Sequence, residues 1–164
     1  MLDAEDKVMN NKKEFFYHNS RTSILLEYDL NRCESFDDFE KRYPEEFLDN
    51  DTQIGDYLSD LLYKYDKKAS AVSEDAGLAT AYVGLIINKK KNNPSRDALI
   101  AICLAIGTTF EEVQYLLKYA GCAPLYVRRK RDVIIWFGFM KGEDIDTVNG
   151  NLTERGMKPL IKEK

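Results

Sequence analysis

The sequence has little of what marks a secreted or membrane-bound protein. No apolar run approaches the ~20 residues that a membrane-spanning helix needs, and the N-terminal stretch MLDAEDKVMNNKK lacks the apolar core of a signal peptide. The three cysteines, Cys33, Cys103 and Cys122, form no CxxC pair. Because Cys103 lies inside the apolar run 98–106, we interpret it as a core thiol in a reducing compartment. We therefore expect a cytoplasmic protein with no membrane partner.

Residues for catalysis or metal binding are equally scarce. His18 is the single histidine, and no cluster of ligands accompanies it, so zinc has no evident site. The sequence has no glycine-rich phosphate loop and no paired nucleophile and base. A short predicted helix after Ser35 carries a group of carboxylates with no basic partner arranged nearby, Glu34, Asp37, Asp38 and Glu40. We interpret this group as a solvated helix face and expect no catalytic residue, no cofactor and no metal ion.

Charge is divided unevenly along the chain. The formal net charge is −4. Residues 1–66, however, carry 8 basic and 17 acidic side chains, a net of −9, and residues 67–164 carry 16 basic and 11 acidic ones, a net of +5. The basic residues gather in three runs, Lys67–Lys68, Lys89–Lys91 and Arg128–Arg131. Such runs are usually solvated surface, but they also attract anionic partners such as nucleic acid.

A repeat of 30 residues fills the C-terminal part of the chain. Residues 96–125 align with residues 131–160 without a gap, at an offset of 35. The identities are mostly apolar or punctuating residues: Arg96/Arg131, Asp97/Asp132, Ile100/Ile135, Gly107/Gly142, Val113/Val148, Leu117/Leu152, Gly121/Gly156, Pro124/Pro159 and Leu125/Leu160. Each copy indicates an apolar helix, a Gly break, an amphipathic helix, a Gly C-cap and a Pro stop. The repeat thus predicts two helical hairpins.

Local propensity and the repeat disagree in the second copy. Residues 133–140, VIIWFGFM, are rich in β-branched and aromatic side chains, which favour a strand. Their gapless match to residues 98–105 indicates a helix, and we follow the repeat. Trp136 and Phe137 are then expected in the core. The two hairpins are expected to share that core through Leu99, Ile102, Val113 and Leu117 of one and residues among Ile134, Phe137, Val148 and Leu152 of the other.

An amphipathic helix precedes the repeat. Its apolar residues follow the i, i+3, i+4, i+7 pattern, Ile54, Tyr57, Leu58, Leu61, Leu62 and Tyr65, with Thr52 or Asp51 placed to cap it. Further on, Ala76 is small where two helices cross closely, and Gly77 can adopt the positive φ of a tight turn. The patterns predict helices over 53–65, 69–76, 80–88, 96–105 and 110–119, the last two capped by Ser95 and by a Thr109–Glu112 capping box.

Several of these positions together carry a resemblance to a known family. They are Val72, Ala76, Gly77, Leu78, Tyr82, Val83, Ile86, Asn93–Ser95, Leu99, Ile102, Ala105, Gly107 and Thr108–Glu112. Residues 54–121 resemble the helix-turn-helix domain of the Cro and phage-repressor type, the lambda-repressor-like family. The resemblance implies an all-α fold with a five-helix domain over 51–125. The second hairpin would follow over 126–164, packed on that domain, and a partly helical acidic arm would precede it over 1–50.

The resemblance also implies a function, binding of duplex DNA with the second helix of the motif in the major groove. The implied DNA-binding positions are Thr80, Ala81, Gly84, Leu85, Asn88, Lys89, Lys90, Lys91, Arg96, Arg128 and Arg129. Among the base-facing positions Thr80, Ala81, Gly84 and Leu85, only Thr80 offers a hydrogen-bonding side chain. Lys89–Lys91 would hold phosphates and give salt-dependent affinity. A non-enzymatic transcriptional regulator is the function that we expect.

A second interpretation keeps the helix-turn-helix fold as a protein-interaction module. Small and apolar residues, Ala79, Ala81, Gly84 and Leu85, occupy the face where a DNA reader has polar ones, and such a face suits a partner helix or a second subunit. The acidic arm would repel DNA unless it moved, or would itself cover the basic face. Short helices are expected in the arm near 22–30 and 36–42, either docked or ordered only when a partner binds.

Overall fold

The computed structural model describes residues 23–44 and 53–161, and every helix or strand assigned in those ranges is an α-helix. This confirms the expected all-α class. The described residues belong to two units, one within residues 1–48 and one within residues 49–164. His18 and the proposed caps Asp51 and Thr52 lie outside the described residues.

The first unit contains α2 (Ser23–Leu30) and α3 (Phe36–Arg42), close to the two short helices that the sequence predicts. Ser35 caps α3, because its hydroxyl accepts a hydrogen bond from the Asp38 backbone N–H at 3.2 Å. The Arg42 Nε donates to the Asp38 carboxylate at 2.8 Å. The expectation that the acidic group has no basic partner is therefore wrong, since the i, i+4 spacing brings Arg42 onto the same face of the helix.

The second unit contains seven helices among its described residues: α4 (Gln53–Lys64), α5 (Ala69–Asp75), α6 (Tyr82–Ile87), α7 (Arg96–Ile106), α8 (Phe110–Tyr119), α9 (Lys130–Lys141) and α10 (Ile145–Glu154). Helix α9 confirms the helical interpretation of residues 133–140, where propensity alone favours a strand. The largest difference from the predicted bounds is in α6, which begins at Tyr82 rather than at residue 80. The Tyr82 N–H donates to the Ala79 carbonyl oxygen at 2.8 Å, so residues 79–82 form a turn before the helix.

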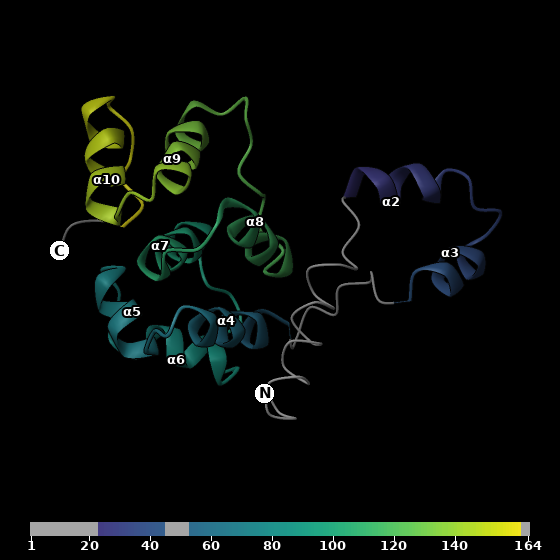
Figure 1. The fold of residues 1–164 in the computed structure, drawn as a ribbon, viewed down its shortest axis with the longest axis horizontal. Helices are drawn as coiled ribbons and strands as arrows, with labels where there is room; N and C mark the ends of the chain where they lie inside the picture. Colours follow the sequence, from purple (N-terminus) through teal and green to yellow (C-terminus); the bar gives the residue numbers. More distant parts are fainter. Residues whose placement is uncertain (1–22, 45–52, 162–164) are drawn as a thin grey trace, which may run out of the picture. The chain divides into compact units, whose positions relative to one another are not determined.

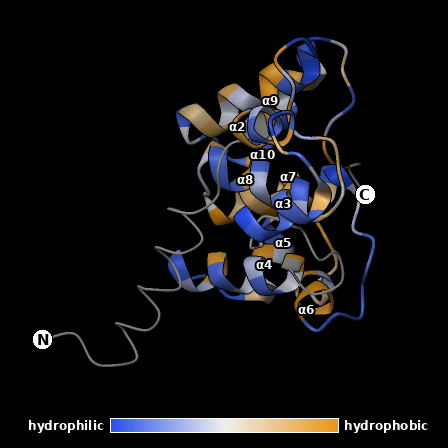
Figure 2. Cartoon of the chain, turned by 90° about the vertical axis from the view of Figure 1, so that its right-hand side faces the viewer, coloured by the Kyte–Doolittle hydropathy of each residue, from blue (hydrophilic) through white to orange (hydrophobic). Residues whose placement is uncertain are grey.

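Helix α7 lies at the centre of the second unit (Figure 1). Helices α4, α5 and α6 lie on one side of it and α9 and α10 on the other, in both views (Figures 1 and 2). Every residue from Ala98 to Leu104 is buried. Burial raises the pKa of the Cys103 thiol to about 12, in agreement with its expected place in the core. The apolar run of the first repeat is thus a helix covered on all sides, which explains why it lacks a polar face.

Capping residues end the helices where the sequence predicts. Gly107 follows α7 with a φ of 83° and Gly142 follows α9 with a φ of 65°, both in the left-handed region that favours glycine. Ser95 caps α7, and Thr109 and Glu112 form the expected capping box of α8. The two copies of the repeat therefore share the glycine that ends their first helix as well as the helices themselves.

The two copies are held together by a reciprocal pair of ion pairs. Arg96 contacts Asp132 at 2.9 Å, and Arg131 contacts Asp97 at 2.9 Å, so the arginine of each copy binds the aspartate of the other. Helix contacts follow the same exchange, because α7 packs against α10 and α8 packs against α9. This is the pairing of an isologous interface between two like subunits, here made within one chain.

One shared apolar core joins the two copies. Leu99, Ile102, Val113 and Leu117 lie in it together with Ile135, Phe139, Val148 and Leu152, as the packing of the two hairpins predicts. Phe137 is a correction, because 48% of its surface is exposed. The α9 face that turns inward carries Ile135 and Phe139, four residues apart, and Phe137 lies between them on the outside. Trp136 is half-buried and stacks on Phe110 with 3.8 Å between ring centroids.

No helix among the described residues is long and apolar enough to cross a membrane.

Candidate nucleic-acid interface

Helices α5 and α6 are joined through the buried side chain of Ser73. Its hydroxyl donates to the Ala69 carbonyl oxygen at 2.8 Å and accepts from the Val83 N–H at 3.0 Å. It therefore satisfies a backbone donor in the first turn of α6, which has no capping side chain of its own. Gly77, with a φ of 72°, turns the chain between the two helices as expected. Sequence reasoning missed Ser73, although its place beside the core residue Val72 was the available signal.

Helix α6 packs closely on the start of α4. Val83 and Ile86 are buried, as predicted. A Cβ atom at Gly55 would lie 3.0 Å from the Ile86 carbonyl oxygen and 3.1 Å from that of Ile87. Only a glycine allows this approach without displacing the backbone of α6. The sequence does not predict this role of Gly55, because an isolated glycine inside an amphipathic helix has no partner visible in the sequence.

The outward face of α6 offers few hydrogen-bonding groups. Ala81 and Leu85 are exposed, and a Cβ atom at Gly84 would have no neighbour within 4 Å. Figure 2 shows α6 in the orange of hydrophobic residues. Thr80 lies in the turn ahead of the helix, and its hydroxyl donates to the Glu74 carboxylate at 3.0 Å. The polar side chain expected to read bases is thus already bonded to an acidic neighbour.

Basic side chains follow α6 directly. Asn88, Lys89 and Lys90 are exposed, and Lys89 has a positive φ of 59° that ends the helix. The Lys91 ammonium lies 4.8 Å from the centroid of the Tyr82 ring, a cation–π contact that fixes the loop against the helix. Partial burial raises the pKa of the Tyr82 hydroxyl.

The remaining predicted positions lie elsewhere. Arg96 bonds to Asp132 and donates to the carbonyl oxygens of Ala123 and Pro124, so it holds the two repeats together. Arg128 and Arg129 are exposed and precede α9. Helices α6 and α9 lie at opposite ends of the second unit in both views (Figures 1 and 2). The structure therefore brings Thr80 to Lys91 together and leaves Arg96, Arg128 and Arg129 apart from them.

Charges of both signs surround the α5–α6 pair. Lys67 and Lys68 are exposed ahead of α5, whereas Glu74 and Asp75 are exposed at its end. Within the part of the chain that the structure describes, no group of His, Cys, Asp or Glu residues is arranged to hold a metal ion.

Comparison of the chain with models of protein families, with curated proteins and with solved structures finds no match.

Proposed function

We propose that the protein is a helix-turn-helix regulator that binds duplex DNA through α5 and α6, mainly by contacts to the phosphate backbone. The proposal combines the resemblance of residues 54–121 to the phage-repressor type with the exposed lysines at both ends of the α5–α6 pair. In this arrangement α5 and α6 would be the two helices of the motif, and α6 would face the major groove.

The placement of the two lysine groups toward opposite ends of α4 is the observation that carries the proposal. Lys67 and Lys68 follow the end of α4, whereas Lys89 and Lys90 follow the end of α6, which packs on the start of α4 at Gly55. The twelve residues of α4 span about 18 Å. This length sets the approximate separation of the two lysine groups and is somewhat greater than the ~12 Å width of the major groove. Each lysine group would thus meet phosphates on one side of the groove.

Weak sequence preference follows from the face between the lysines. Ala81, Gly84 and Leu85 can touch a thymine methyl group but cannot form the bidentate hydrogen bonds that distinguish base pairs. To contact a base, the Thr80 hydroxyl would have to break its hydrogen bond to Glu74. We therefore expect affinity to depend strongly on salt and weakly on DNA sequence.

Fluorescence anisotropy with a labelled random-sequence duplex tests the proposal. The change Lys89→Ala/Lys90→Ala should weaken binding and lower the slope of log K against log salt by about 1.8, since each lost phosphate contact contributes ~0.9. The matched control Lys141→Ala/Lys158→Ala removes two lysines outside α5, α6 and the loops beside them, and should leave the slope unchanged. Absence of duplex binding at about 50 mM salt would contradict the proposal.

A second candidate function, a protein-interaction module, is favoured by a different observation. The exposed carboxylates of Glu74 and Asp75 lie at the end of α5, one element before α6, and would repel phosphate, whereas a protein surface accommodates them together with the apolar face of α6. If this candidate is correct, Leu85→Glu should abolish capture of a partner and leave the melting temperature unchanged, because Leu85 is 39% exposed.

A further inference from the structure

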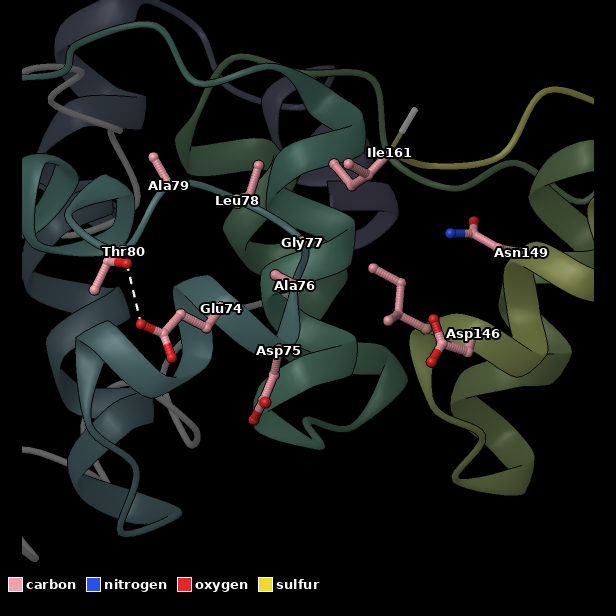
Figure 3. A pocket seen from close by; sticks show the side chains of 11 residues that line it. Glu74, Asp75, Ala76, Gly77, Leu78, Ala79, Thr80, Asp146, Asn149 and Ile161 are labelled. Carbon is pink, nitrogen blue, oxygen red and sulfur yellow. Dashed lines mark hydrogen bonds between the residues drawn. The ribbon is translucent and has the colours of Figure 1, made fainter. Parts of the chain in front are cut away.

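An open groove of about 620 Å³ lies between the turn that follows α5 and the face of α10. Figure 3 shows the turn on one side of the groove and Asp146 and Asn149 of α10 on the other. Leu78, Ile145 and Ile161 line it and are each partly exposed. The groove is formed jointly by the helix-turn-helix region and the second copy of the repeat.

The ionisable residues that line the groove are all acidic. They are Glu74, Asp75 and Asp146, and no basic residue is among the described residues that line it. Asn149 accepts a hydrogen bond from the Leu160 N–H through its Oδ1 at 2.8 Å. Its amide nitrogen points toward the turn in Figure 3, where it can donate to a carbonyl oxygen of an occupant. A ligand that fits the groove therefore combines positive charge with apolar side chains.

A segment of that composition projects from the same protein. Residues 126–130, YVRRK, comprise a turn, in which the Arg129 N–H donates to the Tyr126 carbonyl oxygen at 3.0 Å, and the first residue of α9. Tyr126 is 51% exposed and Val127 is 64% exposed. Arg128, Arg129 and Lys130 are exposed, and none of the ion pairs found in the described part of the chain includes them. Two apolar side chains and three cations thus lie together, and the three cations form no ion pair with the described residues.

We propose that this turn of one copy docks in the acidic groove of a second copy. The turn and the groove of one chain are separate, because residues 126–130 do not line the groove. Tyr126 is also held in place by its N–H, which donates to Asp132 at 3.0 Å. The contact therefore joins two chains. Since the two surfaces differ, it is heterologous and can continue from chain to chain until a ring closes.

Sedimentation velocity of the full chain without DNA tests the docking. We expect the average mass to rise between ~10 µM and ~500 µM protein, the range of a weak specific contact. The rise should be large at about 50 mM salt. At about 1 M salt, where the Debye length is ~3 Å, the dissociation constant should be at least tenfold higher. A monomer throughout this range at low salt would overturn the proposal.

Charge reversal identifies the two surfaces separately. Asp75→Lys/Asp146→Lys in the groove and Arg128→Glu/Arg129→Glu in the turn should each give a monomer. A mixture of the two variants should associate again, because the intact turn of one variant can dock in the intact groove of the other and the two reversed surfaces are also complementary. One chain carrying all four changes should self-associate again. Association that persists in either variant, or a mixture that stays monomeric, would contradict head-to-tail docking.

Control variants exclude effects of net charge and of folding. Glu111→Lys/Glu154→Lys matches the charge change of the groove variant, Lys141→Glu/Lys158→Glu matches that of the turn variant, and both should still associate. The milder Asp75→Asn/Asp146→Asn covers the case in which the lysine variant does not fold. Lys89→Ala/Lys90→Ala should associate as the unchanged chain does, so failure of DNA binding and failure of docking are distinguished.

Discussion

Glu112 shows how one side chain can serve two levels of structure. It is fully buried, and its carboxylate accepts from the Thr109 N–H at 2.9 Å to close the capping box of α8. The same carboxylate accepts from the Tyr65 hydroxyl at 2.7 Å and forms an ion pair with Lys64. A residue that the sequence assigns to a local cap therefore also binds the end of α4.

Replacement of Glu112 should separate these two roles. Glu112→Ala leaves buried polar groups without partners and should lower the free energy of unfolding by about 3 kcal/mol. Glu112→Gln keeps an acceptor for Thr109 and Tyr65 and should cost less. Its exposed neighbour provides the control, since Glu111→Ala should change stability by no more than about 0.5 kcal/mol. Urea denaturation measures all three, and equal costs at the two positions would show that the burial of Glu112 has no energetic role.

At the scale of elements, the second repeat depends on the close approach of α9 and α10. A Cβ atom at Gly138 would lie 2.5 Å from the Val148 Cγ2 atom, well inside contact distance. Gly138 occupies the position that Cys103 holds in the first copy. The two hairpins therefore share a pattern of helices but differ at this position, where the second leaves no room for a Cβ atom.

Gly138→Ala should accordingly destabilise the protein by about 1–3 kcal/mol through overpacking. In a Val148→Ala background the same change should become stabilising, because alanine is intrinsically better than glycine in a helix by ~1 kcal/mol. Gly150→Ala in α10, where a Cβ would meet nothing within 4 Å, should be stabilising in the unchanged protein. Thermal melts of the four variants test whether Gly138 is needed for packing. If its role were purely conformational, replacement by alanine would change the melting temperature in the same direction at Gly138 and at Gly150.

The ion pairs between the repeats also belong to this scale. Double-mutant cycles with Arg96→Met and Asp132→Asn should give a coupling energy of about 1–3 kcal/mol. The cycle with Arg131→Met and Asp97→Asn should give less, since the Asp97 side chain is 22% exposed and that of Asp132 only 3%. Denaturant unfolding provides both values. The reverse order would mean that burial does not set the strength of these pairs.

At the scale of the whole molecule, the first 66 residues carry a net negative charge and the remainder carries a net positive charge. If the acidic segment screens the basic face of the second unit, removal of residues 1–48 should strengthen duplex binding. The gain should be greatest near 10 mM salt, at least about tenfold, because the Debye length there is ~30 Å. Anisotropy titrations of the full and shortened chains at two salt concentrations test this, and equal affinities at low salt would remove the screening role.

The sequence alone predicts features that depend on neighbours along the chain. The helical class, the caps at Ser95 and Thr109 and the turn at Gly77 follow from hydrogen bonds and backbone preferences that act within a few residues. The helix at 133–140 is predicted for a different reason. Its local propensity favours a strand, but the repeat implies that it must match the surface of the first hairpin.

The tertiary structure alone decides what depends on contacts between distant segments. The pairing of Arg96 with Asp132, the exposure of Phe137 and the link from Ser73 to Val83 all depend on which face of a helix meets another helix. The helical period locates an apolar stripe in the sequence. It does not determine the rotation of the helix about its axis closely enough to say which residues at the border of the stripe are buried. Packing of α9 against both α8 and α10 fixes that rotation, because only one face can fill the shared core.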